Sequence, residues 1–341
     1  MRRAIALLAL AGCTSKTPPP DPRIEEGRAL YGTYCALCHG DKGQGYLADN
    51  ATAITHPEFL ASASDELLRR AIVRGHPGTT MSAWGKAQGG PLADADVDRL
   101  IVFLRAQATK PAIDVTEKVT GGEALRGQGS YGAWCVGCHG AEGKGGKFTT
   151  ISSPEFLAVA SDGYLRHAIA RGRTGTPMPA FADTLSEQTI RDLVALVRSW
   201  ARPPGDTTPD LPSKDLGDPA LNPKGPEAAL EGDGTYVKVA TVKAEIDRGA
   251  RIILLDARAP GDYVQEHIAG AVSVPFYAVS EYLTQLPKEV WIVPYCACPH
   301  AASGVAADTL KKAGYTRVRV LDEGFFYWRD QGFPTHVGPK P

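Results

Sequence analysis

Two short segments of the chain each place two cysteines and a histidine within five consecutive positions. They read Cys-Ala-Leu-Cys-His over 35–39 and Cys-Val-Gly-Cys-His over 135–139. Two thiols at this spacing, followed directly by an imidazole, are the attachment pattern of c-type haem: the thiols add to its vinyl groups and the imidazole binds its iron. The residues predicted to act in this way are Cys35, Cys38, His39, Cys135, Cys138 and His139.

Zinc is the alternative occupant of a Cys-x-x-Cys pair. A tetrahedral zinc site needs two further ligands close to each pair. A histidine fused directly to the second cysteine is poorly placed to fill the fourth corner, so the sequence favours haem.

The two segments lie in a longer internal repeat that covers residues 25–106 and 123–201. Beyond the cysteines, the repeats share a Pro-Glu-Phe-Leu run, an Ala-Ile-x-Arg-Gly run and one methionine each. Apart from Met1, the chain contains only Met81 and Met178, each about 40 residues after its histidine. Self-similarity of this kind indicates a duplicated structural unit.

The repeats resemble the class I cytochrome c family in their cysteine–histidine segments and their methionines. The resemblance implies two haem c groups, with Met81 and Met178 as sixth iron ligands opposite the histidines. A methionine ligand favours ferrous iron and raises the reduction potential. Because both axial positions are then filled, the expected function is electron transfer. His76 and His167 are alternative sixth ligands, although they do not occupy equivalent positions in the two repeats.

Two all-α domains are therefore expected, over residues 24–108 and 120–202. Apolar residues recur with helical spacing over 97–104 and 190–197, which predicts an amphipathic C-terminal helix in each domain. Ser186 is the expected N-cap of the second of these helices.

A glycine and a tyrosine four positions apart precede each cysteine pair. They are Gly27 with Tyr31 and Gly127 with Tyr131. In the cytochrome family, this combination of a small and an aromatic residue lets the first helix cross the last one closely. We expect the same crossing in both repeats.

Residues 203–234 are rich in proline, glycine and aspartate and show no sustained periodicity, which predicts a linker. If mostly extended at about 3 Å per residue, such a segment would reach roughly 100 Å.

The last part of the chain, residues 235–338, has a different character. Continuous apolar runs over 252–256 and 290–295 indicate buried parallel strands. Helical patterns over 241–248 and 303–313 alternate with them, as in an α/β fold. The predicted class is thus multidomain: two all-α cytochrome c domains followed by an α/β domain with a parallel sheet.

This region resembles the rhodanese family over about 100 residues. The segments that carry the resemblance are, in chain order, Asp256–Arg258, His267–Pro275, Tyr295–Cys296, Leu321–Gly324, Trp328 and Gly332–Pro334. In that family a cysteine at a strand end accepts sulfane sulfur as a persulfide. Backbone N–H groups and a helix N-terminus stabilise its thiolate. The resemblance implies that Cys296 is the nucleophile, Asp256 and Arg258 brace its loop as a buried pair, and His267 is structural.

The Cys296 loop departs from the family pattern. It contains a second thiol, Cys298, is about one residue longer, and lacks the Arg or Lys that commonly holds thiosulfate; His300 is its only candidate cation. Three interpretations remain open: a persulfide carrier with Cys298 as resolving thiol, a redox Cys-x-Cys pair without sulfur transfer, and an inert fold.

The N-terminus predicts export and anchoring. Arg2 and Arg3 precede an eight-residue apolar run that is too short to span a bilayer but suits a signal peptide. Leu-Ala-Gly-Cys, ending at Cys13, resembles the bacterial lipobox. It implies cleavage after residues 1–12 and lipidation of Cys13, with residues 13–23 as a Pro-rich tether. The alternative is an ordinary signal peptide. Thr14 rather than aspartate follows the cysteine, which favours the outer membrane on its periplasmic side.

Composition narrows the function. The 341 residues carry a formal charge of −1 and are 43% hydrophobic, which excludes a disordered chain and argues against nucleic-acid binding. The leading hypothesis is a membrane-anchored dihaem cytochrome of a respiratory chain, coupled to inorganic sulfur through Cys296. The alternatives are a pure electron carrier with an inert rhodanese fold and a sulfurtransferase that uses haem for sensing.

Overall fold

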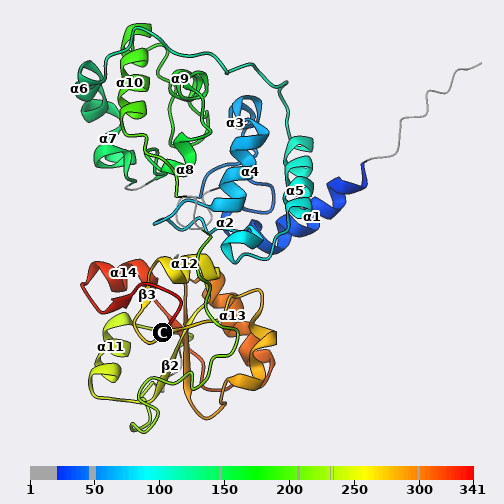
Figure 1. Ribbon diagram of the computed structural model, residues 1–341, viewed down its shortest axis with the longest axis vertical. Helices are drawn as coiled ribbons and strands as arrows, with labels where there is room; N and C mark the ends of the chain where they lie inside the picture. The colour runs from blue at the N-terminus through cyan, green and yellow to red at the C-terminus, as the bar shows by residue number, and fades with distance from the viewer. Residues whose placement is uncertain are drawn as a thin grey trace, which may run out of the picture.

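The computed structural model describes residues 21–45, 51–145, 148–205, 208–230, 232, 234–297 and 300–341. Figure 1 shows two helical modules beside each other above an α/β domain. We call residues 22–106 module 1, residues 124–199 module 2 and residues 236–336 the C-terminal domain. Within the described ranges, no helix is both long and apolar enough to cross a membrane.

Both modules follow the same succession of helices. Module 1 contains α1 (Pro22–Tyr34), α2 (Ala36–His39), α3 (Pro57–Ser62), α4 (Asp65–Arg74), the 3-10 turn η1 (Lys86–Gln88) and α5 (Asp94–Ala106). Module 2 contains α6 (Ala124–Trp134), α7 (Val136–His139), η2 (Ala141–Gly143), α8 (Pro154–Leu157), α9 (Asp162–Arg171) and α10 (Glu187–Ser199). The predicted C-terminal helices are α5 and α10. Ser186 caps α10 as expected, because its hydroxyl accepts the Thr189 N–H at 3.1 Å.

The first helix of each module crosses the last one at a glycine, as predicted. A Cβ atom on Gly27 would lie 2.1 Å from the Arg99 carbonyl oxygen, and one on Gly127 would lie 2.5 Å from that of Asp192. No side chain fits at either crossing. One turn later, buried tyrosine hydroxyls donate to the carbonyl that follows the histidine, at 2.6 and 2.7 Å: Tyr31 to Gly40 and Tyr131 to Gly140.

The two modules pack against each other through equivalent elements. Helix α3 lies against α9, and α4 lies against α8, where α8 and α9 are the repeat counterparts of α3 and α4. Two ion pairs are reciprocal in the same way: Glu58 with His167 at 2.9 Å and Glu155 with Arg70 at 2.7 Å. Reciprocal contacts of this kind are the mark of an approximate two-fold axis between the modules.

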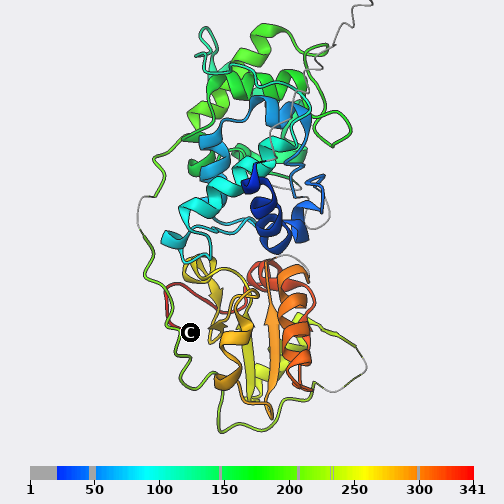
Figure 2. The same cartoon turned by 90° about the vertical axis from the view of Figure 1, so that its right-hand side faces the viewer.

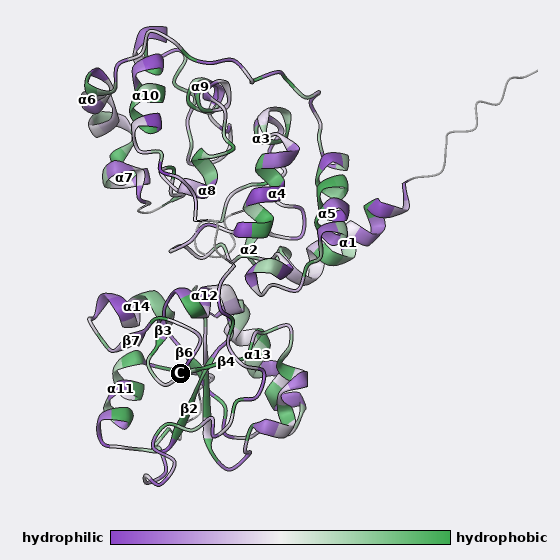
Figure 3. Ribbon diagram, viewed as in Figure 1, coloured by the Kyte–Doolittle hydropathy of each residue, from purple (hydrophilic) through white to green (hydrophobic). Residues whose placement is uncertain are grey.

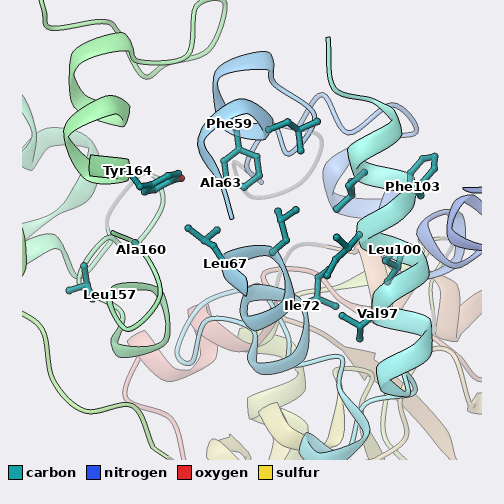
Figure 4. Packing of buried hydrophobic residues seen from close by; sticks show 14 of the residues in the cluster. Phe59, Ala63, Leu67, Ile72, Val97, Leu100, Phe103, Leu157, Ala160 and Tyr164 are labelled. Carbon is teal, nitrogen blue, oxygen red and sulfur yellow. The ribbon is translucent and has the colours of Figure 1, made fainter. Parts of the chain in front are cut away.

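A shared hydrophobic cluster fills this interface (Figure 4). It contains Phe59 and Leu67 of module 1 together with Leu157, Ala160 and Tyr164 of module 2. Since both modules contribute buried side chains, they form one helical body.

The C-terminal domain is built on a parallel sheet. Its strands are β1 (Tyr236–Val237), β2 (Ile252–Asp256), β3 (His267–Ile268), β4 (Val272–Ser273), β5 (Trp291–Tyr295), β6 (Val320–Leu321) and β7 (Thr335–His336). Its helices are α11 (Val239–Asp247), α12 (Pro260–Gln265), α13 (Ala301–Lys312) and α14 (Gly324–Asp330), with turns η3 (Val279–Glu281) and η4 (Leu283–Gln285). The central order is β4–β2–β5, all parallel, and every residue of β2 and β5 is buried. Hydrophobic colouring marks β2 in Figure 3.

The second half of the predicted linker 203–234 packs against the C-terminal domain and does not extend away from it. The Leu221 N–H donates to the Ile252 carbonyl at 2.8 Å, beside β2. Ala228 and Leu230 are buried in the core of the C-terminal domain. Isolated apolar residues bury themselves there without any periodicity, which is why the sequence pattern does not show it.

The C-terminal domain lies against module 1, and Figure 2 shows its sheet ending below that module. Trp84 of module 1 packs on Phe276 and Tyr277, with ring centroids 6.2 Å apart in both pairs. Tyr34 adds an edge contact to Tyr277 at 5.7 Å. Helix α13, which follows Cys296, lies against α2, the cysteine–histidine helix of module 1. The carboxyl edge of the sheet therefore faces the helical body.

Candidate functional site

One cavity of about 800 Å³ joins the two modules. Aromatic and aliphatic side chains form much of its wall, and α14 adds Phe326 and Arg329 from the C-terminal domain. It is lined by all eight predicted haem-binding residues, which are Cys35, Cys38, His39, Met81, Cys135, Cys138, His139 and Met178. Side chains from distant parts of the sequence thus meet around a single space.

The two histidines are oriented identically. Nδ1 of His39 lies 2.8 Å from the Thr52 carbonyl oxygen, and Nδ1 of His139 lies 2.8 Å from that of Thr149. A carbonyl only accepts, so Nδ1 carries the proton and Nε2 keeps its lone pair. Burial lowers the pKa of both histidines, which favours the neutral form that binds metals. A metal-binding imidazole usually donates its other ring N–H to a carbonyl or carboxylate in this way.

The two methionines lie in loops with the same hydrogen bonds. The Met81 N–H donates to the Thr79 hydroxyl at 3.1 Å, and its carbonyl accepts the His76 N–H at 2.9 Å. In module 2 the corresponding bonds join Met178 to Thr176 at 3.2 Å and to Arg173 at 2.8 Å. Both thioethers are therefore presented to the cavity by equivalent backbone.

The structure separates the two alternative sixth ligands. His76 lines the cavity, with its Nδ1 buried and lacking a hydrogen-bond partner among the described residues. Burial, together with nearby His39, lowers the pKa of His76 to about 4. His167 instead binds Glu58 in the module interface and is not among the residues that line the cavity, so it is no longer an alternative to Met178. Its repeat counterpart is Arg70, which pairs with a carboxylate in the same way.

Haem c fits this site. Two thiols, a neutral imidazole with its Nε2 available, and a thioether face the same apolar space in each module. These donors are the ones that a covalently held haem with His and Met axial ligands requires.

Cys296 lies elsewhere, directly after β5 and before α13. The side chain is 2% exposed, and its Sγ lies 3.2 Å from the buried Ser303 hydroxyl of α13. Its carbonyl accepts the Phe325 N–H at 2.9 Å. The thiol thus sits at the carboxyl edge of the sheet, where open α/β folds bind their ligands.

Of the two residues predicted to act with Cys296, the structure describes only His300. Cys298 lies outside the described residues, as does Cys13. His300 adopts a left-handed backbone with φ of 73°, and its Nε2 lies 2.9 Å from the Asp322 carbonyl oxygen and 3.0 Å from its carboxylate. Its ring also packs on Tyr236 at 3.9 Å. The only candidate cation of the loop is thus engaged by neighbouring groups.

The expected bracing pair is confirmed. Arg258 and Asp256 form a buried ion pair with bonds of 2.6 and 2.9 Å, and the Tyr295 hydroxyl donates to the same carboxylate at 2.9 Å. His267 is fully buried, stacks on Tyr263 at 3.6 Å and bonds the Tyr263 carbonyl through Nδ1 at 2.7 Å. These contacts are structural, as the resemblance implied.

Sequence reasoning missed Thr52 and Thr149, which orient the histidines. Their signal was present: they are separated by 97 residues, the same separation as Pro57 and Pro154 in the shared Pro-Glu-Phe-Leu run. Extending the repeat alignment backwards from that run finds them.

Comparison with known proteins agrees with this architecture. Residues 22–104 and 122–197 match the family model described as cytochrome c oxidase, cbb3-type, subunit III, and residues 238–331 match the rhodanese-like domain. The cbb3-type oxidase subunit FixP of Bradyrhizobium sp. (strain ORS 278) is 26% identical over 212 residues, covering 58% of this chain and 69% of FixP. The subunit CcoP of Azospirillum sp. (strain B510) is 25% identical over 191 residues, covering 51% and 60%.

Among solved structures, the rhodanese-like domain of the Alr3790 protein from Anabaena sp. is 27% identical. The match covers 31% of this chain and 80% of the Anabaena chain, with a TM-score of 0.29. The chain spans 60–69% of the length of the two oxidase subunits. Together the family matches define cytochrome c domains followed by a rhodanese-like α/β domain, and they support an electron-transfer cytochrome with haem c.

Proposed function

We propose that this protein is a dihaem c-type cytochrome that passes single electrons in an extracytoplasmic respiratory chain. The observation that carries the proposal is the duplicated donor set: both modules direct an imidazole Nε2, two thiols and a thioether into one cavity. Haem c held there supplies one-electron exchange at each iron.

The chain's own residues set the conditions for that exchange. The Thr52 and Thr149 carbonyls fix the tautomers of His39 and His139 and raise the basicity of Nε2. The apolar wall would keep water from a bound haem, and the thioethers of Met81 and Met178 would raise its reduction potential if they bound the iron.

Haem counting tests this proposal. Matured in a host that attaches haem c, the wild-type chain is expected to hold two haem groups, measured from the absorbance of the pyridine haemochrome. The double variant Cys35→Ala, Cys38→Ala retains one haem, and so does Cys135→Ala, Cys138→Ala. Cys296→Ala is the matched control and retains two. Purified wild-type protein with zinc or without Soret absorption would contradict the proposal.

The C-terminal domain extends the proposal to sulfur. Cys296 carries sulfane sulfur as a persulfide, supported by its place at the sheet edge before α13 and by the Ser303 hydroxyl 3.2 Å from its sulfur. Joining hydrosulfide to the Cys296 thiolate as a persulfide releases two electrons and one proton. Two haem groups that each accept one electron match that number.

A pure electron carrier with an inert rhodanese fold is the second candidate. The near-complete burial of Cys296 and the engagement of His300 by Asp322 favour it. Sulfide or polysulfide added to the oxidised holoprotein distinguishes the two. Faster growth of the haem α-band in wild type and Lys312→Ala than in Cys296→Ala supports the persulfide, and equal growth in all three supports the inert fold.

Membrane attachment through a lipid on Cys13, on the periplasmic side, completes the proposal. Cys13→Ser is expected to move the protein from the membrane fraction to the soluble periplasmic fraction. Ser15→Ala, two positions away, is the control and stays with the membrane. An unchanged distribution of Cys13→Ser would contradict lipid anchoring and leave the haem proposal intact.

A further inference from the structure

Three hydrogen bonds, linked through the covalent skeletons of two threonines, form a path between the two predicted iron-binding histidines. It runs from His39 Nδ1–H to the Thr52 carbonyl at 2.8 Å, and from His139 Nδ1–H to the Thr149 carbonyl at 2.8 Å. Between them, the hydroxyls of Thr52 and Thr149 lie 3.2 Å apart and bond to each other. Each threonine therefore serves both links, its carbonyl holding a histidine and its hydroxyl reaching the other module.

The position of this contact is set by the pairing of the modules. Thr52 and Thr149 are counterparts in the repeat, and a residue meets its own counterpart only at the axis that relates the two units. The ion pairs Glu58–His167 and Glu155–Arg70 lie away from the axis, one on each side of it. In both of them a glutamate binds a residue that is not its own repeat counterpart. The threonine pair is thus the polar contact between equivalent residues.

This hydrogen-bond path could couple the two histidines energetically. The strength of an Nδ1–H bond sets the basicity of a metal-binding imidazole. Energetic coupling between sites is carried by connected networks of hydrogen bonds and packed groups. A change at one histidine would reach the other through these three bonds and the threonine backbones between them.

We propose that the Thr52–Thr149 hydroxyl bond couples the two haem sites, so that the reduction state of one module alters the histidine and the reduction potential of the other. This inference rests on the proposed function, since it requires haem in both modules. Coupling between two binding equilibria is reciprocal, so each site shifts the other equally.

Valine substitution tests the bond with little change in shape. Thr52→Val and Thr149→Val keep the backbone carbonyl and its histidine, and remove only a hydroxyl. In the reduced holoprotein, the Nδ1–H proton resonance of His139 is expected to shift in Thr52→Val, although the substitution lies in the other module. The part of the potential of one haem that depends on the reduction state of the other is expected to decrease, leaving the direct Coulomb contribution.

A double-mutant comparison sharpens the test. Because one bond joins the two hydroxyls, the loss of inter-haem coupling in the double variant should equal that of either single variant. Additive losses in the double variant would overturn the proposal, since they would show independent local effects.

Two controls separate coupling from structure. Glu58→Gln weakens the module interface at a position outside the path between the histidines. Thr33→Val removes an exposed hydroxyl of α1 that donates to the Ala29 carbonyl. Both are expected to leave the His139 resonance and the coupling unchanged. Equal effects in Glu58→Gln and Thr52→Val would overturn the proposal. Protein with fewer than two haem groups would instead contradict the proposed function, and the haem count made first distinguishes the two failures.

Discussion

At the scale of single residues, the predicted haem-binding residues match between the two modules, but one neighbouring residue differs. His76 in module 1 and Arg173 in module 2 occupy the same position of the repeat, and both line the cavity. Burial lowers the pKa of His76 to about 4, so it is neutral near pH 7. Arg173 keeps its charge under all ordinary conditions. The site in module 2 therefore experiences a positive charge that module 1 lacks.

Arg173→Gln is expected to lower the reduction potential of the haem in module 2. A nearby positive charge stabilises the iron state that holds the extra electron, and its loss costs about 1 kcal/mol, or roughly 40 mV for one electron. Spectroelectrochemical titration of the holoprotein measures this. His76→Gln replaces one neutral group by another and serves as the control, with a smaller shift. A larger shift in His76→Gln than in Arg173→Gln would contradict the argument.

Asp262 of α12 introduces a pH dependence where the C-terminal domain meets module 1. Burial raises the pKa of this carboxyl from 3.8 to about 6, against opposing contributions from Arg258 and from a hydrogen bond with Ser82. The folded protein then holds this proton more tightly than the unfolded chain does. Its contribution to stability is fully present below about pH 4 and is lost as the pH rises through about 6.

Asp262→Asn is expected to remove this dependence. At pH 7 the variant should be more stable than wild type by on the order of 2 kcal/mol, and the difference should vanish towards pH 4. Urea unfolding at pH 4, 5, 6 and 7 measures it. Asp308→Asn, at an exposed position of α13, is the control and should leave the pH profile unchanged. A variant profile parallel to that of wild type would count against the raised pKa.

At the scale of elements, the helix crossings are the most constrained contacts of the modules. The Arg99 carbonyl occupies the space of a Cβ at Gly27, whereas nothing lies within 4 Å of a Cβ at Gly32 in the same helix. The two glycines therefore offer a matched comparison within α1.

Gly27→Ala is expected to destabilise the protein by about 2–3 kcal/mol, because α1 must move away from α5. Gly32→Ala should instead stabilise it by about 0.5–1 kcal/mol through helix propensity. Thermal unfolding followed by circular dichroism compares them. Equal transitions for the two variants would mean that α1 and α5 do not cross as closely as described.

Local sequence patterns predicted individual helices and their crossings. They did not predict contacts between segments that are far apart in the sequence. Periodicity located α5 and α10, and the glycine–tyrosine spacing located the crossing at Gly27. The Thr52–Thr149 contact depends on how the modules pair, which no single-segment pattern encodes. The burial of Leu230 against the C-terminal domain was missed because a single apolar residue in a Pro- and Gly-rich segment gives no periodic signal. The contact of His167 with Glu58 could not be predicted either, because Glu58 lies in the other repeat.

At the scale of the whole molecule, the C-terminal domain breaks the two-fold symmetry of the modules. In module 1, Tyr34 at the end of α1 packs on Tyr277. Its counterpart Trp134 in module 2 is 52% exposed, and neighbouring Val136 is also exposed. The C-terminal domain therefore covers the end of α1 beside the cysteine–histidine helix in module 1, whereas the equivalent aromatic residue of module 2 is accessible.

Gly261→Ala is expected to loosen the C-terminal domain from module 1. A Cβ at this position of α12 would lie 2.6 Å from the Gln88 carbonyl oxygen, across the contact. Small-angle X-ray scattering should then give a larger radius of gyration, with secondary structure unchanged. Gly304→Ala in α13, where nothing lies within 4 Å, is the control. An unchanged radius in Gly261→Ala would exclude this close contact in solution.

The cover that α13 lays over α2 fixes an order of assembly. If haem is attached at Cys35 and Cys38 as proposed, both sulfurs must be reachable by the attachment machinery, and in the folded molecule α13 lies against that helix. The covering helix is synthesised more than 250 residues later in the chain. We therefore expect haem attachment to module 1 before the C-terminal domain docks against it.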